Sequence, residues 1–277
     1  MHDEVYFGVK EIVFNNDNEI AKFYETMQIE EKIKLNEYLI IKDKDEKYID
    51  RYRFDGNKLI HFQIKVIDNS YIKKLKPKNY RQQCCFDLLQ NDSIPVKLIT
   101  GNMGSGKTFL AFHHSLDKLE RDKNFKKIVY IRNTVDVKDV PNLGALPNGL
   151  KEKLLPYILP LADCIGNQMG LEILEKQDKI EYIHLGFARG RNFSNSIILV
   201  SESENLTREH VALLLGRVGE GSIIIFEGDV SQVDKKVFQD NSGIQALKNV
   251  LNNNPLFGCV HLDKSERSQV AELSSLF

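Results

Sequence analysis

Short apolar runs recur along most of this chain, and beyond residue 77 they alternate with stretches whose apolar positions have helical spacing. This alternation is typical of parallel strands linked by crossover helices, which cover both faces of the sheet. The pattern therefore predicts an α/β fold with a mostly parallel sheet. The predicted strands are 96–100, 127–131, 180–185, 196–200, 222–227 and 258–262, and the predicted helices are 79–90, 107–121, 149–165, 207–216 and 242–252.

The region before Pro77 has a different pattern. Residues 37–42 and 59–66 are predicted strands, and turn-like residues at 42–47 and 55–57 lie between them. We therefore expect a small β-rich module or linker, followed by the larger α/β domain. The predicted domains are 1–76 and 77–277.

A phosphate-binding loop follows the strand predicted at 96–100. Its residues fit the pattern G-x-x-x-x-G-K-[ST] and precede a predicted helix, which is the context that this motif requires. The loop amides and the helix N-terminus favour anions, Lys107 can reach the outer phosphates of ATP, and the Thr108 hydroxyl can bind Mg²⁺. A plain glycine turn would not need Lys and Thr at these two positions. The loop consists of Gly101, Asn102, Met103, Gly104, Ser105, Gly106, Lys107 and Thr108.

Acidic residues follow two of the later predicted strands. Glu202 comes after the apolar run 197–200, where a phosphate-loop enzyme needs a carboxylate to activate water, so we predict that it is the general base. Gln232 follows the next strand and is a candidate sensor of the γ-phosphate. The simpler interpretations are a buried strand that runs into a solvated Glu, and a Gly-Asp turn at 228–229.

Arginines form a third set of candidate residues, because the planar guanidinium stabilises charge that spreads over phosphoryl oxygens. Arg217 and Arg267 are predicted to be catalytic, one of them across a subunit boundary in a ring or other closed homo-oligomer. Arg132, Arg189 and Arg191 are predicted to contact nucleic acid. The alternative for each is a solvated surface arginine, and the lysines at 73–78 are also typical of a solvated linker.

Composition limits the class of protein. The chain has 277 residues and a net charge of -1, so a contact with nucleic acid would have to use a local basic patch. Four cysteines show no metal-ligand spacing, and the adjacent Cys84 and Cys85 are predicted to be packed thiols. No apolar run approaches the roughly 20 residues that cross a bilayer, and the charged start predicts no signal peptide. These features predict a soluble, cytoplasmic protein without a membrane partner.

The segment from residue 79 to the C-terminus resembles the PhoH family of phosphate-loop ATPases. This resemblance implies a fold similar to the RecA-like core of superfamily 1 helicases, and it implies that Gln82 reads the adenine edge. The matching stretches are 79–82, 131–137, 143–147, 156–157, 186–191, 202–205, 228–229 with Gln232, and 242–243.

The chain departs from the family pattern at one position of the predicted site. Where the family usually has D-E-x-Q-N, this chain has Ser201 in place of the Asp that faces the metal. With this departure, Ser201 is expected to hold a metal-bound water and Asp229 or Glu204 to supply the missing charge, and Mg²⁺ affinity or turnover is expected to be reduced. Residues 5–75 resemble the linker that joins a PIN ribonuclease domain to this ATPase in longer relatives, and without the nuclease's acidic cluster we do not predict RNA cleavage.

Together these patterns predict Mg²⁺-dependent ATP binding and hydrolysis, coupled in helicase-like fashion to RNA or single-stranded nucleic acid. The alternative is a slow nucleotide-binding switch or assembly protein without translocase activity, and Ser201 in place of the family's Asp keeps this alternative open. A small-molecule kinase would need an acceptor pocket or lid that the sequence does not indicate.

Overall fold

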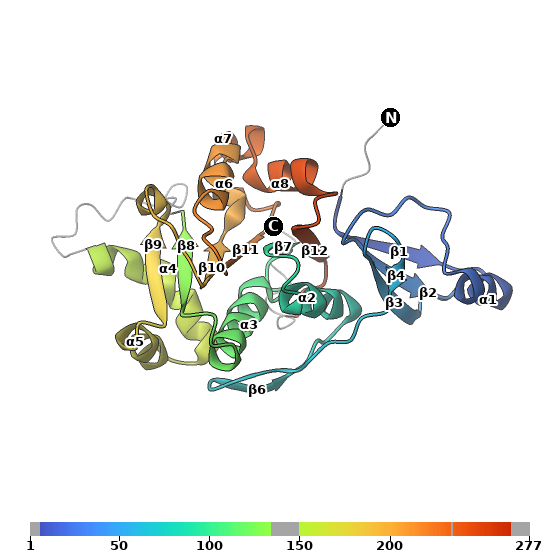
Figure 1. The fold of residues 1–277 in the computed structure, drawn as a ribbon, viewed down its shortest axis with the longest axis horizontal. Coiled ribbons are helices and arrows are strands. Elements are labelled where there is room, and N and C mark those ends of the chain that lie inside the picture. Colours follow the sequence, from blue (N-terminus) through green and yellow to red (C-terminus); the bar gives the residue numbers. More distant parts are fainter. Residues whose placement is uncertain (1–5, 134–149, 234, 267–277) are drawn as a thin grey trace.

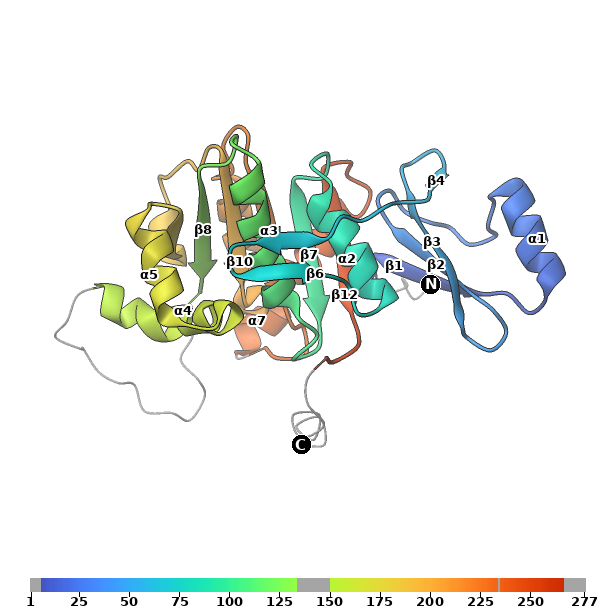
Figure 2. The same ribbon diagram turned by 90° about the horizontal axis from the view of Figure 1, so that it is seen from below.

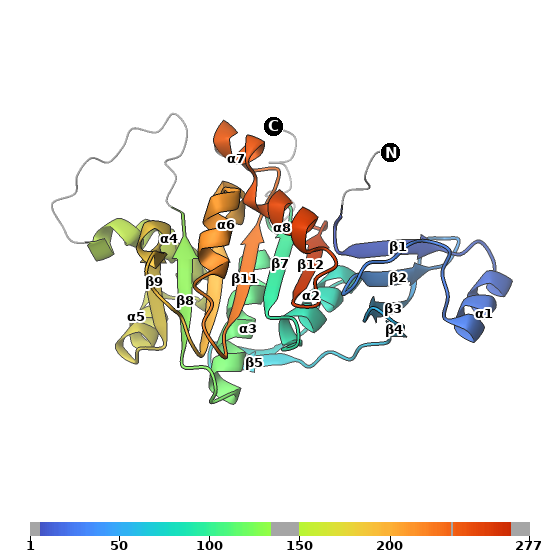
Figure 3. The same cartoon turned by 45° about the horizontal axis from the view of Figure 1, so that its top comes forward.

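A six-stranded, all-parallel sheet forms the centre of the molecule, in the order β12-β7-β11-β10-β8-β9. The computed structural model describes residues 6–133, 150–233 and 235–266. Figure 3 shows the strands side by side, with β9 at one edge and β12 at the other. The α/β, RecA-like prediction is confirmed. The strands are β7 (Val96–Gly101), β8 (Lys127–Arg132), β9 (Ile180–His184), β10 (Ser196–Ser201), β11 (Ile223–Gly228) and β12 (Phe257–Leu262).

Helices cover both faces of this sheet, as the continuous apolar strands require. In β10, Ile197 and Leu199 face one core, and Ile198 and Val200 face the other. Figure 1 shows α2 and α3 on one side of the sheet and α6 and α8 on the opposite side. The helices are α2 (Tyr80–Gln90), α3 (Lys107–Arg121), α4 (Leu150–Ile165), α5 (Gln168–Lys176), α6 (Arg208–Leu215), α7 (Lys236–Asp240) and α8 (Gly243–Leu251), with short 3-10 helices η1 (Leu185–Ala188) and η2 (Ser203–Asn205).

The predicted strands and helices of this domain are confirmed, and their described ends lie within one residue of the predicted positions. Helix α7 was not predicted, and neither was helix α5. The Asn167 side chain caps helix α5 by accepting a hydrogen bond from the Gly170 N–H at 2.7 Å. No helix in the described part of the chain is long and apolar enough to span a membrane.

The N-terminal module is a second sheet, with the order β1-β2-β3-β4 and helix α1 beside it. It lies next to β12 and α2 at one end of the molecule, far from α5 (Figure 1). Tyr38 donates a hydrogen bond to Asp87 of α2 at 2.8 Å, and the Asn36 amide donates to the Phe257 carbonyl of β12 at 2.9 Å. The elements are β1 (Val9–Val13), α1 (Asp17–Thr26), β2 (Tyr38–Lys42), β3 (Tyr48–Phe54) and β4 (Leu59–Ile60).

The strand predicted at 59–66 is wrong beyond Ile60. After β4 the chain leaves the sheet and forms the hairpin of β5 (Ile67–Asn69) and β6 (Ile72–Leu75), which lies across α3 in Figure 2. Polar groups of the hairpin find partners on α3, where the Asn69 amide donates to the His113 carbonyl at 2.9 Å. These contacts compete with continued pairing in the sheet. The domain boundary at residue 77 remains a prediction.

The cysteine prediction is confirmed for Cys84 and Cys85, which are free thiols with no exposed surface in helix α2. Burial raises the pKa of both thiols well above the usual range, so they stay protonated and pack as apolar groups.

His114 in α3 lowers the stability of the fold. Both ring nitrogens are buried without a hydrogen-bond partner among the described residues, and burial lowers the pKa of His114 to about 3. We expect His114→Leu to raise the free energy of unfolding at pH 7 by about 1–3 kcal/mol, because an unpaired buried polar group is removed. The unfolded chain protonates near pH 6.5 and the folded one near 3, so wild-type stability falls as pH drops through this interval.

Urea unfolding of both proteins at pH 7 and pH 5 checks this prediction, and the advantage of His114→Leu should be larger at pH 5. The matched control is His113→Leu in the same helix. His113 contacts the Cys164 carbonyl at 3.0 Å and the Asn69 amide at 3.3 Å, so this control should destabilise the protein. Equal effects of the two substitutions would contradict the argument.

Candidate nucleotide-binding site

The phosphate loop connects the end of β7 to the start of α3. It lies at the carboxyl ends of the strands, where parallel sheets bind ligands. Gly106 has a φ of 90°, a left-handed conformation that glycine adopts without strain. At Gly101 a Cβ atom would lie 2.2 Å from the Leu262 carbonyl oxygen, so only glycine lets the loop pass this close to β12. The sequence thus forms the strand-loop-helix unit that was predicted.

The segment after β12 holds the loop in place. The Asn102 N–H donates to the Leu262 carbonyl at 3.2 Å, and the Glu266 N–H donates to the Gly104 carbonyl at 3.0 Å. The Glu266 carboxylate also accepts a hydrogen bond from the Asn79 amide at 2.8 Å, immediately before α2. The loop is therefore supported from two neighbouring elements besides its own strand and helix.

Lys107 and Thr108 lie in the first turn of α3, and their side chains point to different partners. The Lys107 ammonium donates to the Gly101 and Asn102 carbonyls at 2.8 and 3.0 Å, so it stays over the loop. The Thr108 hydroxyl donates to Glu227 Oε1 at 3.0 Å. The helix N-terminus adds a partial positive charge at the same place, which suits a phosphate group.

Gln82 lies beside the loop, as its predicted role requires. Its amide donates to the Ser105 carbonyl at 3.3 Å and accepts a hydrogen bond from the Lys78 N–H at 2.9 Å. The side chain is 4% exposed and positions the start of α2 against the loop. Its reading of adenine remains a prediction.

Glu227 is the functional candidate that the sequence interpretation missed. It lies on β11, between the strand of the phosphate loop and the strand that ends in Ser201. Its Oε1 accepts hydrogen bonds from Thr108 at 3.0 Å and from the Ser201 hydroxyl. Burial raises the pKa of Glu227, and the bond from Ser201 and the charge of Lys107 oppose this shift. A charged residue inside an otherwise apolar strand was the available signal.

Glu202 begins the turn after β10 and has a φ of 51°, which is uncommon for a residue other than glycine. Its carboxylate forms an ion pair with Arg132 at 2.5 Å, and the Arg132 guanidinium lies over the Tyr157 ring at 5.4 Å. The structure therefore joins the predicted base to one predicted nucleic-acid contact at the ends of neighbouring strands β10 and β8.

Glu204 and Asp229 are two further buried acids that follow strands β10 and β11. The Glu204 carboxylate accepts a hydrogen bond from the Asp229 N–H at 3.0 Å, and burial raises the pKa of Glu204 to about 8. Asp229 Oδ1 accepts from Ser231, and Asp229 Oδ2 is buried without a partner among the described residues. Gln232 follows in an exposed turn. A metal role for Asp229 and a sensor role for Gln232 remain predictions.

The remaining arginines do not gather around the loop. Arg191 pairs with Glu181 at 2.6 Å, and Arg217 donates to the Arg191 carbonyl at 3.3 Å. Glu181 lies near the start of β9, so both arginines lie toward the amino ends of the strands, and the phosphate loop lies at the carboxyl ends. Arg189 is exposed, and Arg267 and the matching stretches 134–137 and 143–147 lie outside the described residues. In the structure, Arg217 therefore lies away from the phosphate loop of its own chain.

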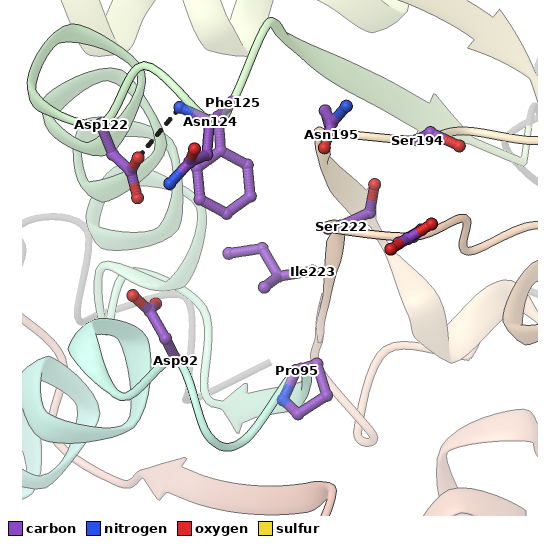
Figure 4. Close-up of a pocket in the computed structure, with 11 residues that line it drawn as sticks. Asp92, Pro95, Asp122, Asn124, Phe125, Ser194, Asn195, Ser222 and Ile223 are labelled. Carbon is purple, nitrogen blue, oxygen red and sulfur yellow. Dashed lines mark hydrogen bonds between the residues drawn. The ribbon is translucent and has the colours of Figure 1, made fainter.

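A polar cavity of about 690 Å³ lies at the amino ends of the sheet, where strands β7, β8, β10 and β11 begin (Figure 4). Pro95, Phe125 and Ile223 line it together with Asp92 and Asp122. Lys118 pairs with both of these aspartates, so their charges already have a partner. The cavity is far from the loop amides and does not belong to the phosphate site.

The residues around Thr108 fit a magnesium ion. The Thr108 and Ser201 hydroxyls and the Glu227 carboxylate are hard oxygen donors, which Mg²⁺ prefers. The described residues contain no cluster of three or more His, Cys, Asp or Glu side chains that could hold a metal alone.

Comparisons with known proteins show which family this chain belongs to. Residues 74–273 match the family model described as PhoH-like protein. The chain is 35% identical over 219 residues to Protein PhoH2 of Bacillus subtilis, which covers 76% of this chain and 49% of the relative. It is 33% identical over 210 residues to a PhoH-like protein of the same organism, covering 74% and 63%, and 29% identical over 202 residues to Protein PhoH2 of Mycolicibacterium smegmatis, covering 72% and 46%. The chain thus spans about half the length of the two PhoH2 relatives.

Proposed function

Because the chain belongs to the PhoH family, a family of nucleotide-binding proteins, we propose that it is an Mg²⁺-dependent ATPase. The observation that carries the proposal is the phosphate loop, with Lys107 and Thr108 at the start of α3 and Glu202 at the end of β10. Loop amides and Lys107 would bind the phosphates, and Glu202 would orient and deprotonate water. Bound Mg²⁺ would neutralise charge on the phosphate oxygens, held near Thr108 and Glu227.

We further propose that hydrolysis is coupled to single-stranded nucleic acid through Arg132. In the ion pair with Glu202, the guanidinium neutralises the carboxylate that is needed to accept a proton from water. A nucleic-acid phosphate that binds Arg132 would release Glu202 and raise turnover. Phe187, which is 56% exposed after β9, and the exposed Arg189 extend this surface with an aromatic face and a second charge.

The test is ATP turnover with and without a panel of single-stranded RNA and DNA. Arg132→Gln should raise basal turnover by up to about fivefold, since a partly exposed ion pair contributes about 1 kcal/mol at most. It should also remove most of the stimulation by nucleic acid. The matched control is Arg121→Gln, because Arg121 forms a partly exposed ion pair with Asp117 at 2.7 Å at the far end of α3.

A rate that no nucleic acid changes, in wild type and in Arg132→Gln, would contradict the coupling. That result would favour the alternative of a slow nucleotide switch or assembly protein, with ATP binding retained. The same proposal includes a closed oligomer in which Arg217 or Arg267 acts from a neighbouring subunit. The panel of RNA and DNA strands identifies which nucleic acid stimulates turnover.

A further inference from the structure

We infer that Glu227 carries the metal-facing carboxylate of this site, in exchange for the Asp that the family pattern places at Ser201. The inference rests on the proposed ATPase function and assigns one residue within it. The charge has moved from the end of β10 to the neighbouring strand β11, and Ser201 now supports it as a hydrogen-bond donor.

The contacts of Glu227 carry this inference. One carboxylate oxygen accepts hydrogen bonds from Thr108, the predicted Mg²⁺ ligand of the loop, and from Ser201. A metal-facing acid in a phosphate-loop site has to meet the loop Thr, and Glu227 does so across the sheet. The Ser201 hydroxyl occupies the place where a second carboxylate would otherwise lie.

Two of the other acids of the region are directed elsewhere. Glu202 pairs with Arg132, and Glu204 binds the Asp229 backbone. Glu227 is 2% exposed, and its described hydrogen-bond partners are neutral hydroxyls. Because both hydrogen bonds come from hydroxyls that can themselves bind a cation through oxygen, the three side chains present their oxygens to one place.

An exchange of charge between two positions makes a reciprocal prediction. Ser201→Asp alone would place two carboxylates side by side, where they repel each other and one stays protonated. It should therefore fail to tighten Mg²⁺ binding. The double variant Ser201→Asp/Glu227→Ser again has one acid and one hydroxyl at these two positions, with the acid on β10 and the hydroxyl on β11. Mg²⁺ binding should therefore be restored.

The experiment titrates Mg²⁺ into the full chain with a fluorescent N-methylanthraniloyl derivative of ADP, and it uses Mn²⁺ as a second probe detected by electron paramagnetic resonance. Glu227→Gln keeps the size of the side chain and should weaken the apparent metal affinity about 10- to 100-fold. Its nucleotide affinity without metal should match wild type. The double variant should recover most of the loss, and Glu209→Gln is the matched control, because Glu209 is an exposed residue in the first turn of α6.

Wild-type metal affinity in Glu227→Gln would overturn the inference, and so would tighter binding in Ser201→Asp alone. The single Ser201→Asp variant tests the inference even if Glu227→Gln does not fold. Binding of Mg²⁺-nucleotide by wild type, together with unaffected Glu227→Gln, overturns the inference and leaves the proposed ATPase standing. If wild type shows no Mg²⁺-dependent nucleotide binding, the proposed function fails and the inference fails with it.

Discussion

Lys107→Ala is expected to lower ATP hydrolysis at least about a hundredfold, the range found when one preorganised donor to a charged transition state is removed. The Lys107 ammonium lies over the loop carbonyls of Gly101 and Asn102, close to where the loop amides would bind phosphate. Alanine keeps the helix start at α3 and removes only the mobile charge. Folding should persist, because the loop is also held by hydrogen bonds from Asn102 and Glu266.

Steady-state release of phosphate measures this effect, and the thermal unfolding midpoint monitors the fold. Lys123→Ala is the matched control, since Lys123 is an exposed lysine just beyond the other end of α3. Parental turnover in Lys107→Ala would show that hydrolysis uses another site or belongs to a contaminant. A low rate together with a lowered unfolding midpoint would instead indicate a structural effect of the substitution.

The sheet and its helices could be predicted from the sequence because their signals are local. A central parallel strand is buried on both faces, so its sequence is a continuous apolar run such as 197–200 in β10. The order of the strands has no local signal, since the sequence does not state that β11 lies between β7 and β10. The strand predicted at 59–66 failed for the same reason, because partners on distant α3 redirected the chain.

The phosphate loop was predicted because its residues are contiguous, whereas the rest of the site is assembled across strands. Glu227 meets Thr108 and Ser201 only after β11 has been inserted between their strands. Its acidic side chain was visible in the sequence, but its partners were not. Likewise, Arg191 and Arg217 follow elements that return to the opposite edge of the sheet, and the pattern of residues did not reveal that direction.

Glu202→Gln is expected to lower ATP turnover by about 10²–10⁴-fold, the usual contribution of a positioned general base. The amide keeps the length of the side chain and removes only its capacity to accept a proton. Nucleotide binding should be retained, because the phosphate loop and Lys107 are unchanged. The strained φ of 51° at Glu202 indicates that the fold holds this residue in place directly after β10. The phosphate loop follows β7 at the same end of the parallel sheet.

Stability distinguishes this role from a structural one. Loss of the ion pair with Arg132 should change the free energy of unfolding by no more than about 1 kcal/mol, because the Glu202 side chain is 41% exposed. Single-turnover hydrolysis, equilibrium binding of labelled ATP and urea unfolding are measured on the same preparation. The control is Glu172→Gln, because Glu172 is an exposed residue of α5. Turnover within tenfold of wild type would remove Glu202 as the base, and the buried acids Glu204 and Glu227 would then be tested next. Tight ATP binding without turnover would instead assign Glu202 to the chemical step, because the substitution leaves the phosphate cradle intact and affects only the activation of water.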